Sequence, residues 1–137
     1  MTAKLIQIPG IVNHHQMVWQ VRVLEIDGRN LVLSYLAEWS KKSPADFKKI
    51  MKVLFMVGQQ DRIRDEKKVK RSKNHDGVYE IRADKGSARL MFFYDHATQS
   101  AVVCTNTYWK TKSSEREQND SFELCARLKK IYEQQNP

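Results

Sequence analysis

The chain is 137 residues long, which fits one domain with a single buried core and no need for disulfide or metal support. It carries 24 lysines and arginines against 16 aspartates and glutamates, a formal net charge of +8, and 41% of its residues are hydrophobic. No apolar run approaches the length of a membrane span, and the first residues lack the pattern of a signal peptide. We therefore expect a cytoplasmic protein without a membrane partner.

The positive charge is concentrated in one short segment. Residues 61–73 hold seven basic and three acidic side chains, a surplus of four out of eight, whereas residues 74–137 hold nine of each. A basic segment of this kind favours a polyanion or an acidic protein as the partner. The alternative interpretation is a solvated, partly helical face that binds no ligand.

The first half of the chain predicts one strand and two helices. Residues 1–16 hold an apolar stretch interrupted by a Pro-Gly pair and form either a turn or an N-terminal extension. Residues 17–27 alternate apolar and polar side chains and end on Asp-Gly, which indicates a strand. Residues 31–42 and 44–58 have apolar side chains at helical spacing, and Ser43 before a proline marks the start of the second helix. We expect these helices to form an antiparallel hairpin on a sheet.

The second half of the chain predicts three strands and a last helix. The strands are expected at 78–83, 88–94 and 101–109, joined by short turns that make them antiparallel neighbours. An amphipathic helix follows and continues to residue 132. The order β-α-α-β-β-β-α predicts an α+β fold with an antiparallel-rich sheet, an N-terminal helical hairpin and a C-terminal helix, in one domain over residues 1–137.

Several kinds of chemistry find no support in the sequence. No cluster of His, Cys, Asp or Glu has metal-ligand spacing, and the chain has neither a Gly-rich phosphate loop nor a G-x-S-x-G turn. Cys104 and Cys125 stand in apolar surroundings without a C-x-x-C pair, so we expect buried, reduced thiols. The sequence therefore predicts no metal site and no cofactor.

Two arginines are the first candidates for a functional site. Arg82 ends one strand of the expected hairpin and Arg89 opens the next, so a tight turn places them near each other. Two guanidinium groups this close repel each other unless they are solvated, paired with Glu80 or Asp84, or facing a phosphate. A surface ion pair with one of these acids is the alternative to a functional site.

The end of the third expected strand adds further candidates. Lys110 and Lys112 follow this strand, at a place where a rigid scaffold commonly presents functional groups. Tyr108 and Trp109 stand beside them and offer a surface on which RNA bases stack, although either aromatic alone fits the core or its rim. The basic segment adds three candidate RNA contacts, Lys68, Lys70 and Arg71.

The second half of the chain resembles a known family. The segments V-Y-E-I-R, S-A-R-L-M-F-F-Y-D and V-V-C-T-N-T-Y-W-K-T-K precede a helix with A-R-L-K-K-I-Y. Together they are similar to the RelE/HigB superfamily of toxins, in the style of its phage-derived, HigB-like branch. The resemblance covers residues 78–132 and implies a RelE-like fold, which the helical hairpin and the basic segment fit more loosely.

The resemblance implies the toxin component of a type II toxin–antitoxin system, an endoribonuclease that cleaves messenger RNA on translating ribosomes. Such enzymes work without metal: the 2′-hydroxyl attacks the adjacent phosphate, and basic side chains stabilise the developing charge. On this sequence the resemblance implies Arg82 and Arg89 as contacts to the phosphate and the transition state. It implies Lys110 and Lys112 as contacts to the RNA or ribosomal backbone. The implied partners are messenger RNA, the ribosome and a cognate antitoxin of the helix-turn-helix type.

Departures from the family pattern keep other interpretations open. Glu80 stands where one branch of the superfamily has a lysine, and the tyrosine expected shortly after the paired lysines is absent. Proton transfer then falls to Tyr108 or His75. The second interpretation is a non-enzymatic protein of the same fold that binds RNA or another protein. The third is a relative that poisons DNA gyrase.

Overall fold

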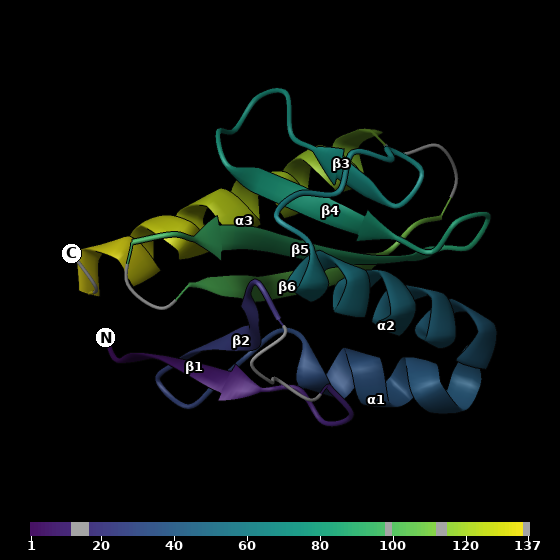
Figure 1. The fold of residues 1–137 in the computed structure, drawn as a ribbon, viewed down its shortest axis with the longest axis horizontal. Coiled ribbons are helices and arrows are strands. Elements are labelled where there is room, and N and C mark those ends of the chain that lie inside the picture. The colour runs from purple at the N-terminus through teal and green to yellow at the C-terminus, as the bar shows by residue number, and fades with distance from the viewer. Residues whose placement is uncertain (12–16, 98–99, 112–114, 136–137) are drawn as a thin grey trace.

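The sheet of this protein has six strands and is covered by helices on both faces. The computed structural model describes residues 1–11, 17–97, 100–111 and 115–135. The elements in chain order are β1 (Ala3–Gln7), β2 (Gln20–Ile26), α1 (Leu33–Lys42), α2 (Pro44–Gln59), β3 (Val69–Arg71), β4 (Val78–Arg82), β5 (Ala88–Asp95), β6 (Ala101–Trp109) and α3 (Glu115–Gln135). The strands lie in the order β1-β2-β6-β5-β4-β3, with β2 and β6 parallel and the other neighbours antiparallel (Figure 1).

The element order differs from the expected β-α-α-β-β-β-α, so the α+β fold class with an N-terminal helical hairpin is wrong. Two strands rather than one precede the helices, because β1 was not expected, and a second unexpected strand, β3, lies in the basic segment. The sequence hides β1 because its partner is distant: Ala3 pairs with Ile26 of β2. It hides β3 because three residues, two of them cationic, show no apolar alternation. Cations on a short edge strand also protect that edge from pairing with another chain.

The helices do not gather on one face of the sheet. Along β5, Leu90, Phe92 and Tyr94 pack into a core that includes side chains of α1 and α2, whereas Met91 and Phe93 pack into a second core with α3. All eight residues of β5 are buried. A strand that is covered on both faces favours apolar side chains on both, which explains the continuous apolar run from Leu90 to Tyr94.

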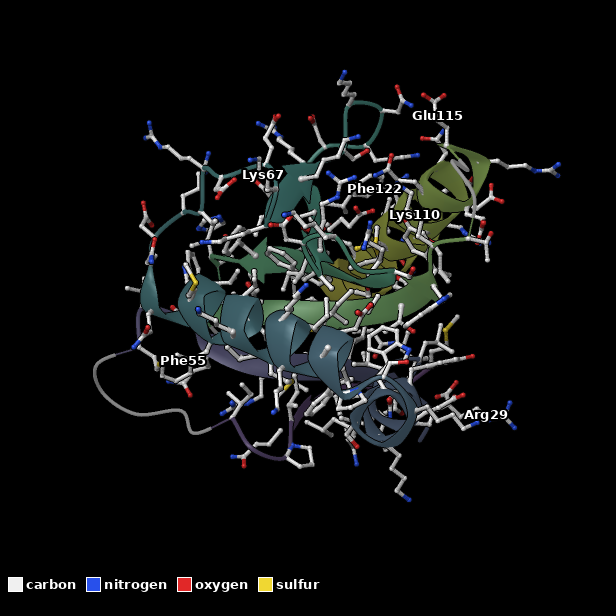
Figure 2. The ribbon with its side chains drawn as sticks, turned by 90° about the vertical axis from the view of Figure 1, so that its right-hand side faces the viewer. Arg29, Phe55, Lys67, Lys110, Glu115 and Phe122 are labelled. Carbon is white, nitrogen blue, oxygen red and sulfur yellow. The ribbon has the colours of Figure 1, made fainter. Side chains whose placement is uncertain are left out.

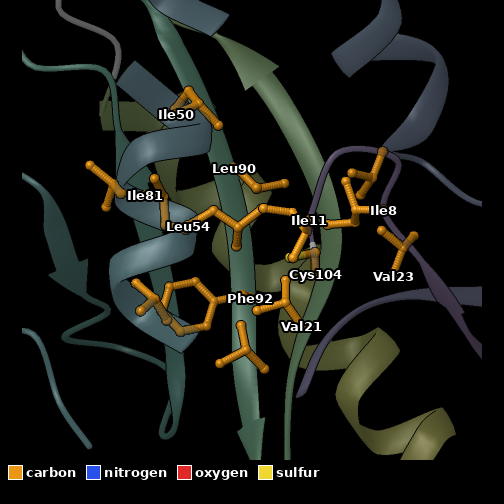
Figure 3. Close-up of a cluster of buried hydrophobic side chains, with 14 of the residues drawn as sticks. Ile8, Ile11, Val21, Val23, Ile50, Leu54, Ile81, Leu90, Phe92 and Cys104 are labelled. Carbon is orange, nitrogen blue, oxygen red and sulfur yellow. The ribbon is translucent and has the colours of Figure 1, made fainter. Parts of the chain in front are cut away.

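The core beneath α2 holds the site's scaffold in place. Ile50 and Leu54 of α2 lie against the sheet, where Ile81, Leu90 and Phe92 belong to the same cluster (Figure 3). All five residues are completely buried. Burial of one such side chain stabilises a fold by about 1.5–3 kcal/mol. The ends of β4 and β5 are therefore anchored on a packed helix.

The start of α2 is tied to the turn between β4 and β5. The segments expected to be helical do form α1 and α2, and Pro44 is the first residue of α2, but Ser43 makes no side-chain capping bond. The first-turn acid, Asp46, reaches across instead: its carboxylate accepts hydrogen bonds from the backbone N–H of Ser87 at 2.7 Å and of Ala88 at 2.9 Å. The turn that carries the candidate arginines is thus fixed by a helix.

Candidate functional site

A cationic pocket of about 450 Å³ lies where β4 ends, β5 begins and the chain leaves β6. Five basic side chains and one acidic side chain line it: Lys67, Arg82, Lys85, Arg89 and Lys110, with Asp84. Figure 2 looks onto this end of the sheet, with Lys110 below Glu115 of α3 on the right and Lys67 to their left. A pocket with this surplus of cations favours an anionic ligand, because like charges at close range repel each other unless an anion lies between them.

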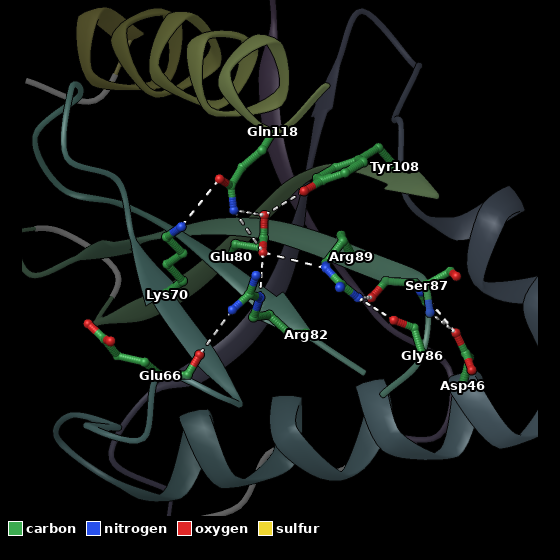
Figure 4. A network of polar contacts seen from close by, with 11 residues as sticks. Asp46, Glu66, Lys70, Glu80, Arg82, Gly86, Ser87, Arg89, Tyr108 and Gln118 are labelled. Carbon is green, nitrogen blue, oxygen red and sulfur yellow. Dashed lines mark hydrogen bonds and ion pairs between the residues drawn. The ribbon is translucent and has the colours of Figure 1, made fainter. Parts of the chain in front are cut away.

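Arg82 and Arg89 lie together as the turn spacing predicts. The two residues are direct partners in the β4–β5 ladder. Both guanidinium groups approach the carboxylate of Glu80: Oε1 lies 3.0 Å from Nε of Arg82 and 3.6 Å from Nε of Arg89 (Figure 4). The alternative interpretation placed an ion pair of this kind on the surface, but the Glu80 side chain is completely buried. The acid is therefore an internal part of the site.

Glu80 accepts hydrogen bonds from two further elements, β6 and α3. The hydroxyl of Tyr108 donates to Oε2 at 2.8 Å, and the side-chain amide of Gln118 donates to both oxygens at 3.1 and 3.3 Å. A buried carboxylate is tolerated only when paired charges and hydrogen bonds replace its water shell. Within the described residues, neither arginine Nε makes a hydrogen bond of acceptable angle, so the contacts with Glu80 are ionic rather than hydrogen-bonded.

Backbone carbonyl groups hold the Arg89 guanidinium in one orientation. Nη1 donates to the carbonyl oxygen of Gly86 at 3.0 Å and to that of Ala88 at 2.9 Å, and only 6% of the side chain is exposed. A Cβ atom on Gly86 would stand 2.5 Å from a carboxylate oxygen of Asp46, so the close approach of the turn to α2 requires glycine here. The turn therefore fixes both the position and the direction of Arg89.

Tyr108 is placed as a hydrogen-bond donor inside this network. Burial raises the pKa of its hydroxyl, and the charge and hydrogen bond of Glu80 raise it further. The phenol is therefore neutral at physiological pH and donates a hydrogen bond to the carboxylate of Glu80. This arrangement favours an orienting role over that of a general base.

The other predicted RNA contacts are spread over the neighbouring surface. Lys70 turns toward α3 and donates to the side chain of Gln118 at 3.3 Å. Arg71 lies 3.8 Å from the exposed carboxylate of Asp76, and Lys68 lies 4.0 Å from that of Asp65. Trp109 is 41% exposed at the end of β6, with its ring 6.2 Å from that of Trp39, so part of it remains free to stack on a base. Lys112 lies outside the described residues.

Sequence reasoning named Glu80 as a surface partner of the arginines but missed its burial and the other residues that organise the pocket. The position of Glu80 indicated its burial, since a carboxylate in the middle of an apolar strand needs a buried partner. The positions of Gln118 and Asp46 gave no such indication, because their contacts join residues 38 and 41 positions apart. Lys67 and Lys85 were not singled out among the many cations of the chain. The described residues hold no group of three or more His, Cys, Asp or Glu placed to bind a metal ion.

The fold and the pocket define a small mixed-sheet protein with a cation-lined hollow at one end of the sheet. Residues 34–128 match the family model described as "Phage derived protein Gp49-like (DUF891)". Because the match covers more than half of the chain, this protein belongs to the Gp49-like family of phage-derived proteins. The family is associated with toxin–antitoxin systems, which points to a cognate antitoxin as a partner.

The match runs from α1 to α3 and so includes every residue that lines the cationic pocket. Comparison with curated proteins and with solved structures found no match. Among the described residues, no helix combines the length and apolar character that crossing a bilayer demands.

Proposed function

We propose that this protein is the toxin of a type II toxin–antitoxin pair and an endoribonuclease that takes the backbone of messenger RNA into the cationic pocket. The observation that carries the proposal is the convergence of five basic side chains on one pocket with a single acid. The bases of RNA differ but its phosphates do not, so a site built from guanidinium and ammonium groups suits the backbone. Translating ribosomes supply such RNA as an extended single strand.

The proposed reaction needs charge stabilisation more than it needs a cofactor. The 2′-oxygen of one nucleotide forms a bond to the adjacent phosphorus and the bond to the 5′-oxygen breaks, which leaves a cyclic phosphate and a 5′-hydroxyl group. The proton of the 2′-hydroxyl is given up, and the departing oxygen gains one. Negative charge rises on the phosphate meanwhile, and in this proposal Arg89, whose direction is fixed by two carbonyl groups, stabilises it together with Lys110 of the same pocket.

The remaining predicted residues take supporting roles in this proposal. Arg82, on the neighbouring strand β4, binds the same phosphate as Arg89. Tyr108 orients the two arginines through its hydrogen bond to Glu80. Trp109 offers its exposed part to a base, and Lys112, two positions after Lys110 in the sequence, adds a further cation for the RNA or ribosomal backbone.

The test is brief induction of the protein in bacteria, followed by mapping of RNA 5′ ends. We expect growth arrest, new ends that carry 5′-hydroxyl groups, and rescue by the antitoxin encoded beside the toxin. Arg89→Lys, which keeps the charge but loses the fork of donors, and Lys110→Ala should each reduce the new ends about 10- to 100-fold. Lys41→Ala on the exposed face of α1 is the control and should cut like the native protein.

A non-enzymatic RNA-binding protein is the second candidate, and one observation favours it. The same carboxylate partly neutralises Arg82 and Arg89, and the nearby phenol is held neutral. A pocket of this kind can bind RNA without any group that moves a proton. Growth arrest with bound but uncut messenger RNA would identify this function, whereas new 5′ ends that vanish in Arg89→Lys would exclude it.

A further inference from the structure

A second hollow, of about 260 Å³, adjoins the cationic pocket on the side of α2. One wall is a stripe of α2 at helical spacing, made of Lys49, Lys52, Val53 and Met56. The opposite side is formed by four residues just before β3, at the end of β4 and in the β4–β5 turn: Lys68, Arg82, Asp84 and Lys85. We call this cavity the α2 hollow.

The α2 hollow and the cationic pocket are adjacent. They share three lining residues, Arg82, Asp84 and Lys85. The backbone N–H of Arg82 donates to the carbonyl oxygen of Lys68 at 2.9 Å, which holds the start of β3 beside the shared wall. A chain-like ligand in the pocket can therefore cross this wall into the hollow without leaving the surface.

The two kinds of lining side chain match the two parts of a nucleotide. The rim carries five cations against one acid, and Lys52 and Lys85 are exposed at it. The floor is apolar, with Val53 buried and Met56 half-buried. Cations suit a phosphate, and an apolar floor suits the face of a base or a ribose.

We infer that the α2 hollow binds a further nucleotide of the same single RNA strand that occupies the cationic pocket. The inference rests on the proposed function, and it names α2 as the surface along which the strand continues. Lys52 and Lys68 contact the phosphate of this further nucleotide, and Val53 and Met56 support the base of the same nucleotide. Lys49 helps to shape the rim, because its Nζ donates to the carbonyl oxygen of Asp84 at 2.7 Å.

The test measures binding of two RNA probes whose 2′-oxygens are all methylated, so that they are not cut. One is a hexauridylate, long enough to fill both cavities, and the other is a diuridylate that fills the cationic pocket alone. The variant is Lys52→Glu, on the exposed face of α2, and Lys41→Glu on α1 is the control with the same charge change. We expect Lys52→Glu to weaken the hexauridylate about tenfold and the diuridylate less than about twofold.

Salt dependence gives a second readout of the same contact. The slope of log affinity against log salt should become shallower by about 0.7 for each phosphate contact that Lys52→Glu removes from the hexauridylate. Lys41→Glu should leave both the affinities and the slope unchanged, while Arg89→Lys should weaken both probes.

The outcomes separate this inference from the proposed function. If the hexauridylate weakens in Arg89→Lys but not in Lys52→Glu, the strand does not enter the α2 hollow, and RNA binding by the cationic pocket stands. If Lys52→Glu weakens both probes equally, the effect is one of general charge and the inference is overturned. If the native protein binds neither probe, the inference and the proposed function both fail.

Discussion

Glu80 and Arg82 form an ion pair across a boundary between core and solvent. Oε1 of Glu80 lies 3.0 Å from Nε of Arg82, yet the acid is completely buried and the arginine side chain is 26% exposed. The pair thus turns one end toward the protein interior and the other toward the cationic pocket. Arg89 approaches the same oxygen from the neighbouring strand, so one acid sets the spacing of both arginines.

Replacement of Glu80 by glutamine should destabilise the fold strongly. The amide keeps the shape of the side chain but leaves two nearby guanidinium groups without their counter-charge. Loss of one partner of a buried pair costs about 3–5 kcal/mol, and the partial exposure of Arg82 places this case near about 3 kcal/mol. Urea denaturation would measure the change.

The matched control for this prediction is Glu38→Gln. Glu38 pairs with Lys42 at 3.3 Å, and both side chains are at least half exposed, so the same substitution should cost less than about 1 kcal/mol. Equal losses in the two variants would show that burial of Glu80 contributes nothing to the strength of its ion pairs.

Replacement of Tyr108 by phenylalanine should remove one charged hydrogen bond and little else. The hydroxyl donates to Glu80 at 2.8 Å, and a bond to a charged group is worth about 1.5–3 kcal/mol. Tyr35→Phe, at an exposed position of α1, should change stability by less than about 0.5 kcal/mol.

RNA cleavage would test the assignment of Tyr108 to an orienting role. Because the raised pKa keeps this phenol protonated, any RNA cleavage by the native protein should show no rise in rate between neutral pH and pH 9 that follows ionisation of the phenol. Tyr108→Phe should keep the shape of the pH profile and lower its height. If the cleavage rate of the native protein instead rises at alkaline pH and this rise is absent from Tyr108→Phe, Tyr108 is the general base.

Replacement of Asp46 by alanine should loosen the turn that holds Arg89. Two backbone N–H groups, of Ser87 and Ala88, would lose their acceptor, at about 1–3 kcal/mol in total because the site is partly exposed. Amide hydrogen exchange should accelerate at these two positions. The control is Asp84→Ala, an exposed acid in the same turn, for which exchange at Ser87 and Ala88 should stay slow.

The parts of the structure that the sequence predicted depend on local signals. Strands at 78–82, 88–95 and 101–109 lie within one residue of their expected positions, since polar turns and apolar runs define them without reference to the rest of the chain. The juxtaposition of Arg82 and Arg89 followed from the same local hairpin. It needed no knowledge of the sheet beyond one turn.

The parts that the sequence did not predict depend on distant partners. β1 is a strand only because β2 pairs with it, and the element order was wrong for that reason. Glu80 is buried because Gln118 of α3 covers it, and no local pattern announces which helix lies on which face. The pocket was therefore foreseen as a set of cations but not as the acid-centred network that orders them.

The stability of the protein should fall with pH above 9, and the two cysteines are the reason. Burial raises the pKa of the Cys125 thiol from 9.0 to about 12, and burial raises that of Cys104 as well. Below pH 9 both thiols are protonated in the folded and the unfolded chain, so they add no pH dependence. Above pH 9 the unfolded chain loses these protons while the folded chain keeps them. Each thiol then lowers the free energy of unfolding by up to about 1.4 kcal/mol per pH unit as its ionisation in the unfolded chain becomes complete.

The slope of this decline identifies its source. Denaturation under reducing conditions at closely spaced values between pH 9 and about 9.5 would measure the slope where tyrosines contribute only a minor part, since the pKa values of Tyr94 and Tyr108 are ordinarily 10.0 and are raised in the fold. Cys125→Ala leaves a small void and lowers stability at every pH, but it removes one titrating group. Its slope should therefore be about half that of the native protein, and an unchanged slope would assign the alkaline transition to other groups.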